Sequence, residues 1–135
     1  LLFAIFFNLS NPHRISVIPK FYDAEEIPKV DISLVKENHE KNETILVDTR
    51  PSNFFDQQHI KGAINLPLSI FDIMYMMERL ASLEKTKKII VYGRSISALY
   101  DEEVARKLIL RGHQNVQIFK GGLSGWKKRG YPVEP

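Results

Sequence analysis

Apolar residues in this chain gather in short continuous runs, and the segments between the runs have helical spacing. The runs predict buried strands at residues 44–48, 62–66, 88–92 and 116–119. Runs without alternating polar positions are typical of a sheet that is covered on both faces, because neither face then meets water. The remaining segments predict helical structure after Asp31, at 52–58, at 70–83, from Asp101 to Gly112 and at 124–128.

The longest predicted helix, residues 70–83, carries all 3 methionines of the chain. Ile73, Met77 and Leu80 share one face at helical spacing, and we expect that face to be buried. The methionine and aromatic side chains of this helix indicate core packing rather than a binding groove. They are Phe71, Met74, Tyr75, Met76 and Met77.

Strands that alternate with helices define the fold class. They predict an α/β domain with a mostly parallel central sheet and helices on both faces. The C-terminal ends of parallel strands lie at one edge of the sheet, and ligands bind beyond that edge. Asp48 ends one predicted strand and Gly93 follows another, so we expect both residues at the ligand-binding edge.

The chain divides near residue 30. An apolar stub and a proline-interrupted extended connector make up residues 1–30, and a domain follows at 31–135. The apolar residues at 1–9 are too few to span a bilayer, which takes about 20 residues. We interpret them as the end of a membrane anchor or signal sequence upstream of Leu1, or as an apolar element that packs on the domain, and we favour the anchor. An anchor places the domain at a membrane, outside the cytoplasm; a cytoplasmic location is the alternative.

Length and composition fit one folded domain. The chain has 135 residues, of which 44% are hydrophobic and 26% charged, and this is enough for a core without disulfides or a structural metal. It has no cysteine, which excludes cysteine-ligated metal sites and any mechanism in which this chain supplies a thiolate nucleophile. The basic residues behind the net charge of +3 are scattered, so we expect no nucleic-acid partner.

The histidines lack the spacing of a metal site. His13, His39, His59 and His113 form no i, i+4 pair and stand beside no carboxylate cluster, so we predict no metal. No other pattern in the sequence calls for a cofactor, and we predict none. We interpret His59 as a turn or packing residue, because its surroundings in the sequence offer no nucleophile for a general base to activate.

Two motifs resemble the signatures of rhodanese-like domains. The first comprises Val47–Arg50, Phe54 and His59–Pro67, and the second comprises Gly112–Val116, Lys120–Trp126 and Gly130–Val133. The resemblance covers about residues 31–135 and implies a rhodanese-like α/β fold. Gln58 departs from the family, which usually has glycine before the histidine, and we expect this to change only a turn.

The resemblance also points to the residue on which activity depends. In active rhodaneses the residue after the strand at 88–92 is a cysteine that carries the transferred sulfur as a persulfide, stabilised by backbone N–H groups and a helix N-terminus. Gly93 occupies that position, and Ala98 stands where a variant of the loop has a second cysteine. The resemblance therefore implies the fold and the pocket without a catalytic residue.

The loop that begins at Gly93 keeps features of an anion site. A glycine-led loop ahead of a helix offers backbone donors, and Arg94 adds positive charge. We predict that the loop binds sulfate, phosphate or thiosulfate through Gly93, Arg94, Ser95, Ile96, Ser97, Ala98 and Leu99. Asp48 and Arg50 support it, and we interpret them as a structural ion pair rather than as catalytic groups. Arg50, Arg94 and Ser97 are expected around one shallow pocket.

Acidic residues at the start of the following helix argue against the anion. Asp101, Glu102 and Glu103 already complement the positive end of the helix dipole, and they repel an anionic ligand.

Three functions remain open, and we favour the first. It is a catalytically silent binding or regulatory module whose partner is an unidentified protein or a small anion. The second is a sulfurtransferase whose cysteine is replaced in this sequence or supplied by a partner, and the third is a phosphate-ester enzyme, which in related proteins also needs a cysteine. We expect Gly93→Cys to fold but to restore weak activity at best: a Cβ is strained if Gly93 has a positive φ, and the Ile96 and Leu99 side chains crowd the substrate.

Overall fold

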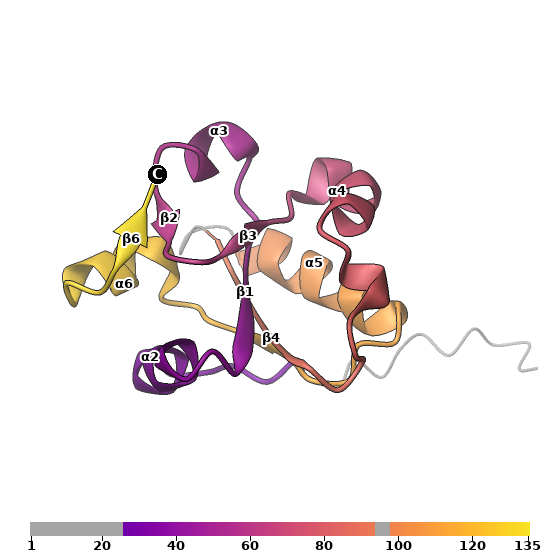
Figure 1. Cartoon of the computed structure of the whole chain (residues 1–135), viewed down its shortest axis with the longest axis horizontal. Coiled ribbons are helices and arrows are strands. Elements are labelled where there is room, and N and C mark those ends of the chain that lie inside the picture. The colour runs from indigo at the N-terminus through magenta and orange to yellow at the C-terminus, as the bar shows by residue number, and fades with distance from the viewer. Residues whose placement is uncertain (1–25, 94–97) are drawn as a thin grey trace, which may run out of the picture.

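Four parallel strands form the centre of the protein in the computed structural model, which describes residues 26–93 and 98–135 (Figure 1). In sheet order they are β3 (Ile64–Asn65), β1 (Thr44–Asp48), β4 (Lys88–Tyr92) and β5 (Val116–Ile118). β1 and β4 pair along their whole length, with Asp48 opposite Tyr92 at the C-terminal end. The order of the strands therefore places the two longest strands in the middle of the sheet.

The path of the chain creates a switch point between β1 and β4. The chain leaves β1 toward β3 on one side and returns to β4 on the other side of β1. The loops after β1 and β4 therefore diverge, and ligands bind at such points of α/β sheets. Thr49 follows β1 and Gly93 follows β4, so both residues lie at this edge.

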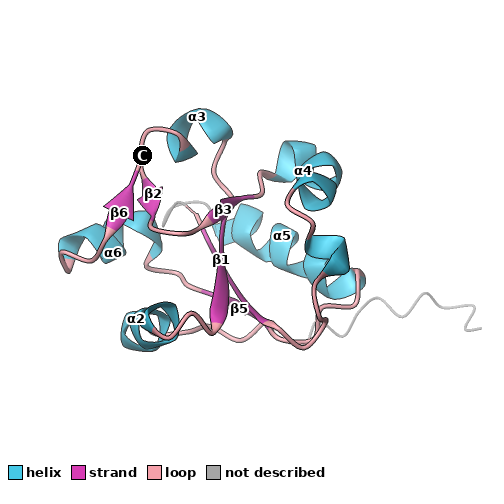
Figure 2. Ribbon diagram, in the orientation of Figure 1, coloured by secondary structure: helices cyan, strands magenta, loops and turns pink. Residues whose placement is uncertain are grey.

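Helices cover both faces of the sheet (Figure 2). α4 (Phe71–Met77) and α5 (Ala98–Leu110) cover one face, and α2 (Ile32–Glu40) and α6 (Gly122–Lys128) cover the other. Successive strand residues point to opposite faces. Val47 and Val91 accordingly join the core beneath α4 and α5, whereas Leu46 and Ile90 join the core beneath α2 and α6. The predicted α/β class, with a mostly parallel sheet between two helical layers, is confirmed.

A small antiparallel sheet lies beside the central one. It consists of β2 (His59–Ile60) and β6 (Val133–Glu134). Strands of two residues carry no hydrophobic period, so the sequence predicted neither of them as a separate strand. The small sheet holds the C-terminal residues against the segment between α3 (Ser52–Phe55) and β3. The phenol of Tyr92 on β4 accepts a hydrogen bond of 3.1 Å from the N–H of Ile60 and links the two sheets.

The predicted strands are confirmed, two of them with changed length. β1 and β4 have the predicted bounds, β5 ends one residue early, and only Ile64–Asn65 of the run at 62–66 is a strand. The helix after Asp31 begins as predicted, because the carboxylate of Asp31 accepts a hydrogen bond of 2.9 Å from the N–H of Ser33. It continues to Glu40.

The helix predicted at residues 70–83 is wrong in its length. A 3₁₀ helix at Leu68–Ile70 precedes α4, and a second one at Leu80–Ser82 follows it. Between α4 and the second 3₁₀ helix, Arg79 has a φ of 55°. This left-handed conformation ends the helical path.

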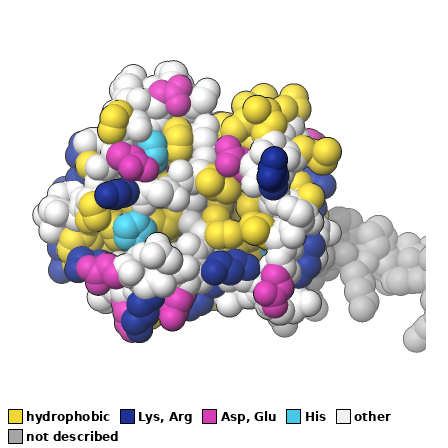
Figure 3. Space-filling model, viewed as in Figure 1, with side chains coloured by type: hydrophobic (Ala, Val, Ile, Leu, Met, Phe, Trp, Pro, Cys, Tyr) yellow, Lys and Arg dark blue, Asp and Glu magenta, His cyan; other side chains and the backbone are white. Residues whose placement is uncertain are grey.

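The predicted buried face of this helix is correct for Leu80, which is buried, and wrong for Ile73 and Met77. Ile73 and Met77 are 62% and 68% exposed, whereas Phe71 and Tyr75 are buried. Both pairs are spaced i, i+4, and the aromatic pair faces the core because it removes more apolar area from water. The exposed hydrophobic side chains gather over α4 on the surface in Figure 3. Core packing therefore accounts for the aromatic residues of α4 but not for Met77 or Met76, which is 71% exposed.

Most of the predicted stub and connector lies outside the described residues, so its membrane attachment stays a prediction. Where the description begins, Lys29 forms a parallel bridge with Ile118 and extends the sheet beyond β5. Over residues 26–93 and 98–135, no helix is both long enough and apolar enough to cross a membrane.

The conformation of Arg79 predicts the effect of a glycine there. Glycine adopts a left-handed φ without steric cost, so Arg79→Gly should raise the free energy of unfolding by about 0.5–1 kcal/mol in urea denaturation. Glu78, with a φ of −75°, provides the matched control. Glu78→Gly should lower the free energy of unfolding by about 0.5–1 kcal/mol, because glycine there only adds freedom to the unfolded chain. Equal destabilisation by both variants would contradict the assigned conformation.

Candidate functional site

A pocket of about 330 Å³ lies at the C-terminal edge of the sheet. Its walls come from the turn after β1, the turn after β3 and the first turn of α5. The lining residues are Thr49, Arg50, Pro51, Phe54, Pro67, Leu68, Ser69, Tyr100 and Asp101. These segments are distant in the sequence and meet because parallel strands end at one edge. The position of the pocket and the presence of Arg50 in its wall agree with the sequence prediction.

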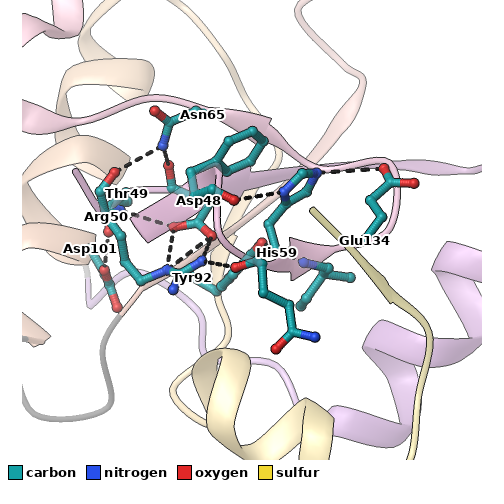
Figure 4. A network of polar contacts seen from close by, with 11 residues as sticks. Asp48, Thr49, Arg50, His59, Asn65, Tyr92, Asp101 and Glu134 are labelled. Atoms are coloured by element: carbon teal, nitrogen blue, oxygen red, sulfur yellow. Dashed lines mark hydrogen bonds and ion pairs between the residues drawn. The ribbon is translucent and has the colours of Figure 1, made fainter. Parts of the chain in front are cut away.

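An ion pair between Asp48 and Arg50 holds the turn after β1 (Figure 4). Asp48 is fully buried. Its Oδ2 lies 2.7 Å from Arg50 Nη2, and Arg50 Nε donates to both carboxylate oxygens at 3.0 and 3.1 Å. Arg50 Nη2 also donates to the carbonyl of Gln58 at 2.6 Å. A buried pair needs such hydrogen bonds to offset its desolvation, and this is the structural ion pair that the sequence predicted.

Neighbouring side chains fix the backbone around this pair. Asn65 Nδ2 donates to the carbonyls of Asp48 and Arg50 at 3.1 and 2.9 Å. Burial raises the pKa of the Tyr92 phenol, and the Asp48 carboxylate adds to the rise. Tyr92 therefore stays neutral beside the carboxylate, and the turn after β1 is rigidly held on two sides.

Arg50 consequently brings no unbalanced positive charge to the pocket. Its side chain is 11% exposed, and Asp48 balances its charge. Its Nε and Nη2 groups are already engaged by Asp48 and by the carbonyl of Gln58. Arg50 thus lines the pocket, while its guanidinium group stabilises the turn after β1.

Asp101 places a carboxylate in the wall of the pocket. It lies in the first turn of α5 and is 4% exposed. Its Oδ1 accepts a hydrogen bond of 2.6 Å from Thr49 Oγ1. Burial raises the pKa of Asp101 to about 6; the hydrogen bond from Thr49 opposes the rise, and the carboxylates of Asp48 and Glu102 add to it. At neutral pH the group is therefore mostly ionised although it is poorly solvated.

The hydrogen bond between Thr49 and Asp101 fills the space beside Gly93. A Cβ on Gly93 would lie 2.3 Å from Asp101 Oδ1 and 2.4 Å from Thr49 Oγ1. Both distances are far below van der Waals contact, so both of these buried groups must move before residue 93 can carry a side chain. The backbone of Gly93 also does not have a positive φ. The condition for left-handed strain in Gly93→Cys is therefore not met, and the obstacle that the structure shows is steric.

The predicted anion loop lies mainly outside the described residues. This applies to Arg94, Ser95, Ile96 and Ser97, so their arrangement around the pocket stays a prediction. Ala98 begins α5, and Leu99 is 80% exposed. The described edge of the loop therefore consists of Gly93 and the first turn of α5.

The described histidines have structural partners. His59 stacks on Phe55 with ring centroids 3.7 Å apart and lies 3.5 Å from the carboxylate of Glu134, which confirms its packing role. His113 is buried with its Nε2 2.9 Å from Tyr75 Oη, and burial lowers the pKa of His113. Across the two described ranges, no group of three side chains is placed to hold a metal ion.

Sequence reasoning missed Thr49 and Asp101 as site residues. Asp101 was assigned only to the helix dipole, and Thr49 was given no role. One signal was available: Thr49 directly follows a strand that ends at the predicted ligand edge. The pairing with Asp101 carries no signal, because the two residues are 52 positions apart.

Comparison with known proteins identifies one family. The family model for the Rhodanese-like domain matches residues 31–129. The chain is 27% identical over 135 residues to the HTH-type transcriptional regulator Rv0324 of Mycobacterium tuberculosis. It is 30% identical over 89 residues to the adenylyltransferase and sulfurtransferase UBA4 of Candida glabrata. These matches cover 98% and 61% of this chain, and they span 57% and 20% of the two relatives.

A solved structure has the same architecture. The thiosulfate sulfurtransferase from Pseudomonas aeruginosa superposes with a TM-score of 0.66 at 26% sequence identity. The match covers 79% of this chain and 20% of the Pseudomonas chain. The similarity therefore concerns one domain of a larger protein.

The crowding beside Gly93 predicts the effect of a single methyl group. Gly93→Ala should lower the free energy of unfolding by about 1–3 kcal/mol in urea denaturation, because the new Cβ overpacks the site of the Thr49–Asp101 hydrogen bond. Gly125 in α6 is the matched control, since the nearest atom to its added Cβ is 4.0 Å away. Gly125→Ala should be neutral or stabilising by up to about 1 kcal/mol. An unchanged free energy of unfolding in Gly93→Ala would contradict this prediction, because it would show that Asp101 and Thr49 move aside without cost.

The raised pKa of Asp101 predicts a pH-dependent effect of Asp101→Asn. The folded protein holds a proton on Asp101 between the ordinary value of 3.8 and about 6, so ionisation above that range destabilises the folded state. Asparagine stays uncharged and keeps an acceptor for Thr49. Asp101→Asn should therefore match the wild type near pH 4 and exceed its stability by about 2 kcal/mol above pH 7.

Chemical denaturation from pH 4 to pH 8 measures this difference. Glu102→Gln removes the neighbouring charge and serves as the control, with an expected change below about 0.5 kcal/mol. A constant difference between wild type and Asp101→Asn across the pH range would contradict the raised pKa.

Proposed function

The chain belongs to the rhodanese-like domain family, and on this premise we propose that it is a catalytically silent member that acts as a binding or regulatory module. The observation that carries the proposal is the occupation of the nucleophile position. Gly93 offers no atom to hold sulfur, and the Thr49–Asp101 hydrogen bond fills the space that a cysteine side chain needs. This region is therefore built for a residue without a side chain.

Charge supports the same proposal. A persulfide or thiolate is an anion, and family chemistry requires donors or cations around it. Here the carboxylate of Asp101 lies beside residue 93 and repels such an anion. The one described cation of the pocket wall, Arg50, is neutralised by Asp48. Both the lack of space and the negative charge beside residue 93 thus disfavour a catalytic cysteine at this position.

One of the two relatives supports a regulatory setting for a module of this kind, whereas the other is named as a sulfurtransferase. One relative is named as a transcriptional regulator and is longer than this chain. Its name does not state a sulfur-transfer activity. We therefore place the proposed function in recognition, with an unidentified protein or a small ligand as partner.

A small anion remains the ligand that the sequence predicts, and it depends on residues beyond the described part of the pocket. Arg94 and the backbone N–H groups of the loop are the predicted donors. Within the described wall, Arg50 is engaged and Asp101 is negatively charged. An anion therefore finds no unpaired cation in the described wall, and the loop is the predicted source of its donors.

The purified protein should show no thiosulfate:cyanide sulfurtransferase activity above buffer, measured as thiocyanate formed. Gly93→Cys should stay near background, because its Cβ collides with Asp101 and Thr49 and its thiolate meets the Asp101 carboxylate. Adding Asp101→Ala to Gly93→Cys removes the carboxylate and releases the Thr49 hydroxyl from its hydrogen bond, so that the hydroxyl can rotate away from the new side chain. The double variant should therefore form thiocyanate at least about tenfold faster than Gly93→Cys alone. Each sample is checked for folding by circular dichroism.

Two outcomes would overturn the proposal. Turnover by the wild-type protein, in a sample that mass spectrometry shows to lack cysteine, would demonstrate sulfur transfer without a thiol. Full activity of Gly93→Cys alone would show that the catalytic loop is intact and that the silent state depends on one residue only.

A further inference from the structure

We infer that the pocket binds an arginine or lysine side chain of a partner polypeptide, with Asp101 as its counter-ion. This inference rests on the proposed function as a binding module, and it names the chemistry of the partner. It reverses the sign of charge expected for a ligand at this edge of the fold.

The carboxylate is preorganised. Asp101 is 4% exposed, and the 2.6 Å hydrogen bond from Thr49 fixes its Oδ1. Thr49 is itself held, because its N–H donates to the carbonyl of Tyr92 at 2.9 Å. A cation that reaches Asp101 therefore meets an oriented acceptor in a poorly solvated place, where a charge-assisted hydrogen bond is stronger than at an exposed surface.

The remaining walls suit the aliphatic stem and flat head of a long basic side chain. Pro51, Phe54, Pro67, Leu68 and Tyr100 contribute apolar or aromatic surface around the pocket. Basic side chains bury their methylene groups against apolar surface, and their cationic ends are attracted to aromatic faces. A small inorganic anion makes no use of such walls.

The charge balance of the described wall is negative. Asp48 and Arg50, in and next to the turn after β1, form a neutral pair. Asp101 is left without a paired cation among the ion pairs of the described residues, and Glu102 on α5 adds negative potential. A cationic ligand therefore supplies the charge that the described part of the wall lacks.

The rim indicates a polypeptide rather than a free amine. Leu99 and Tyr100 are 80% and 56% exposed at the start of α5, and Ile70 is 40% exposed beside the pocket residue Ser69. Tyr100 lines the pocket itself, and Leu99 and Ile70 are the chain neighbours of lining residues, so exposed apolar side chains next to the pocket residues offer contact area to whatever carries the cation. A partner segment with one basic residue between two apolar residues therefore fits this site, because the basic side chain can reach Asp101 while its neighbours contact the exposed apolar side chains.

The probe that tests this inference is an acetylated and amidated Leu-Arg-Leu tripeptide. Its control contains citrulline in place of arginine, which has nearly the same shape but no charge. Titration is followed by the backbone amide resonances of Thr49, Tyr100 and Asp101 in ¹⁵N NMR spectra. The arginine peptide should shift these resonances saturably and should bind at least about tenfold more tightly than the citrulline peptide.

Two variants separate the role of Asp101 from general electrostatics. Asp101→Asn should weaken binding of the arginine peptide by about tenfold or more, whereas Glu102→Gln should change it by less than about threefold. Binding should also strengthen as the pH rises through about 6, the pKa of Asp101. The groups around Asp101 that bear on this profile within the described residues are Asp48, Arg50 and Glu102.

Three outcomes would overturn the inference. They are equal binding of the arginine and citrulline peptides, unmoved resonances at high millimolar arginine peptide, and saturable shifts of the same resonances by sulfate but not by the arginine peptide. The last outcome would restore the anion that the sequence predicts. None of these three outcomes changes the result of the thiocyanate assay. That assay therefore tests the proposed catalytic silence independently of the peptide titration.

Discussion

The buried carboxylate of Asp48 is the constraint on which the ligand edge of this protein depends. A charge at the end of a strand that is covered on both faces must be compensated locally, and Arg50 provides the compensation two residues later. Arg50 in turn binds the carbonyl of Gln58, and Asn65 binds the backbone of the same turn. Thr49 stands between the two charged residues, so its hydroxyl has a fixed direction toward α5. The Asp48–Arg50 ion pair therefore fixes the turn after β1, and this turn forms one wall of the pocket.

The fold and the chemistry of the site have separated in this chain. The parallel sheet, its two helical layers and the turns after β1 and β3 are those of a rhodanese-like domain. The centre of the ligand edge contains a hydrogen-bonded carboxylate where the family places an anionic sulfur. A scaffold that brings strand ends together is indifferent to which side chains meet there. The separation therefore needs no change in the sheet.

Particular residues explain what the sequence predicted and what it did not. β1 and β4 were predicted to the residue, because continuous apolar runs between polar turns have few other interpretations. The helix at 70–83 was misassigned because the Ile73–Met77 and Phe71–Tyr75 pairs compete for the same core, and helical spacing does not rank them. β2 and β6 are too short to show a period. The ligand edge followed from topology, whereas the contact between Thr49 and Asp101 depends on three-dimensional proximity that no local pattern encodes.

The crowding beside Gly93 has an evolutionary consequence. One base change converts a glycine codon into a cysteine codon, so regaining a thiol appears simple at the level of the gene. The protein opposes it, because the new side chain meets Asp101 and Thr49 before it can meet a substrate. A productive reversal needs a second substitution at one of those positions, and that substitution alone sacrifices the hydrogen bond that orders the pocket. A return to a cysteine by one substitution at a time therefore passes through variants that the packing beside residue 93 disfavours.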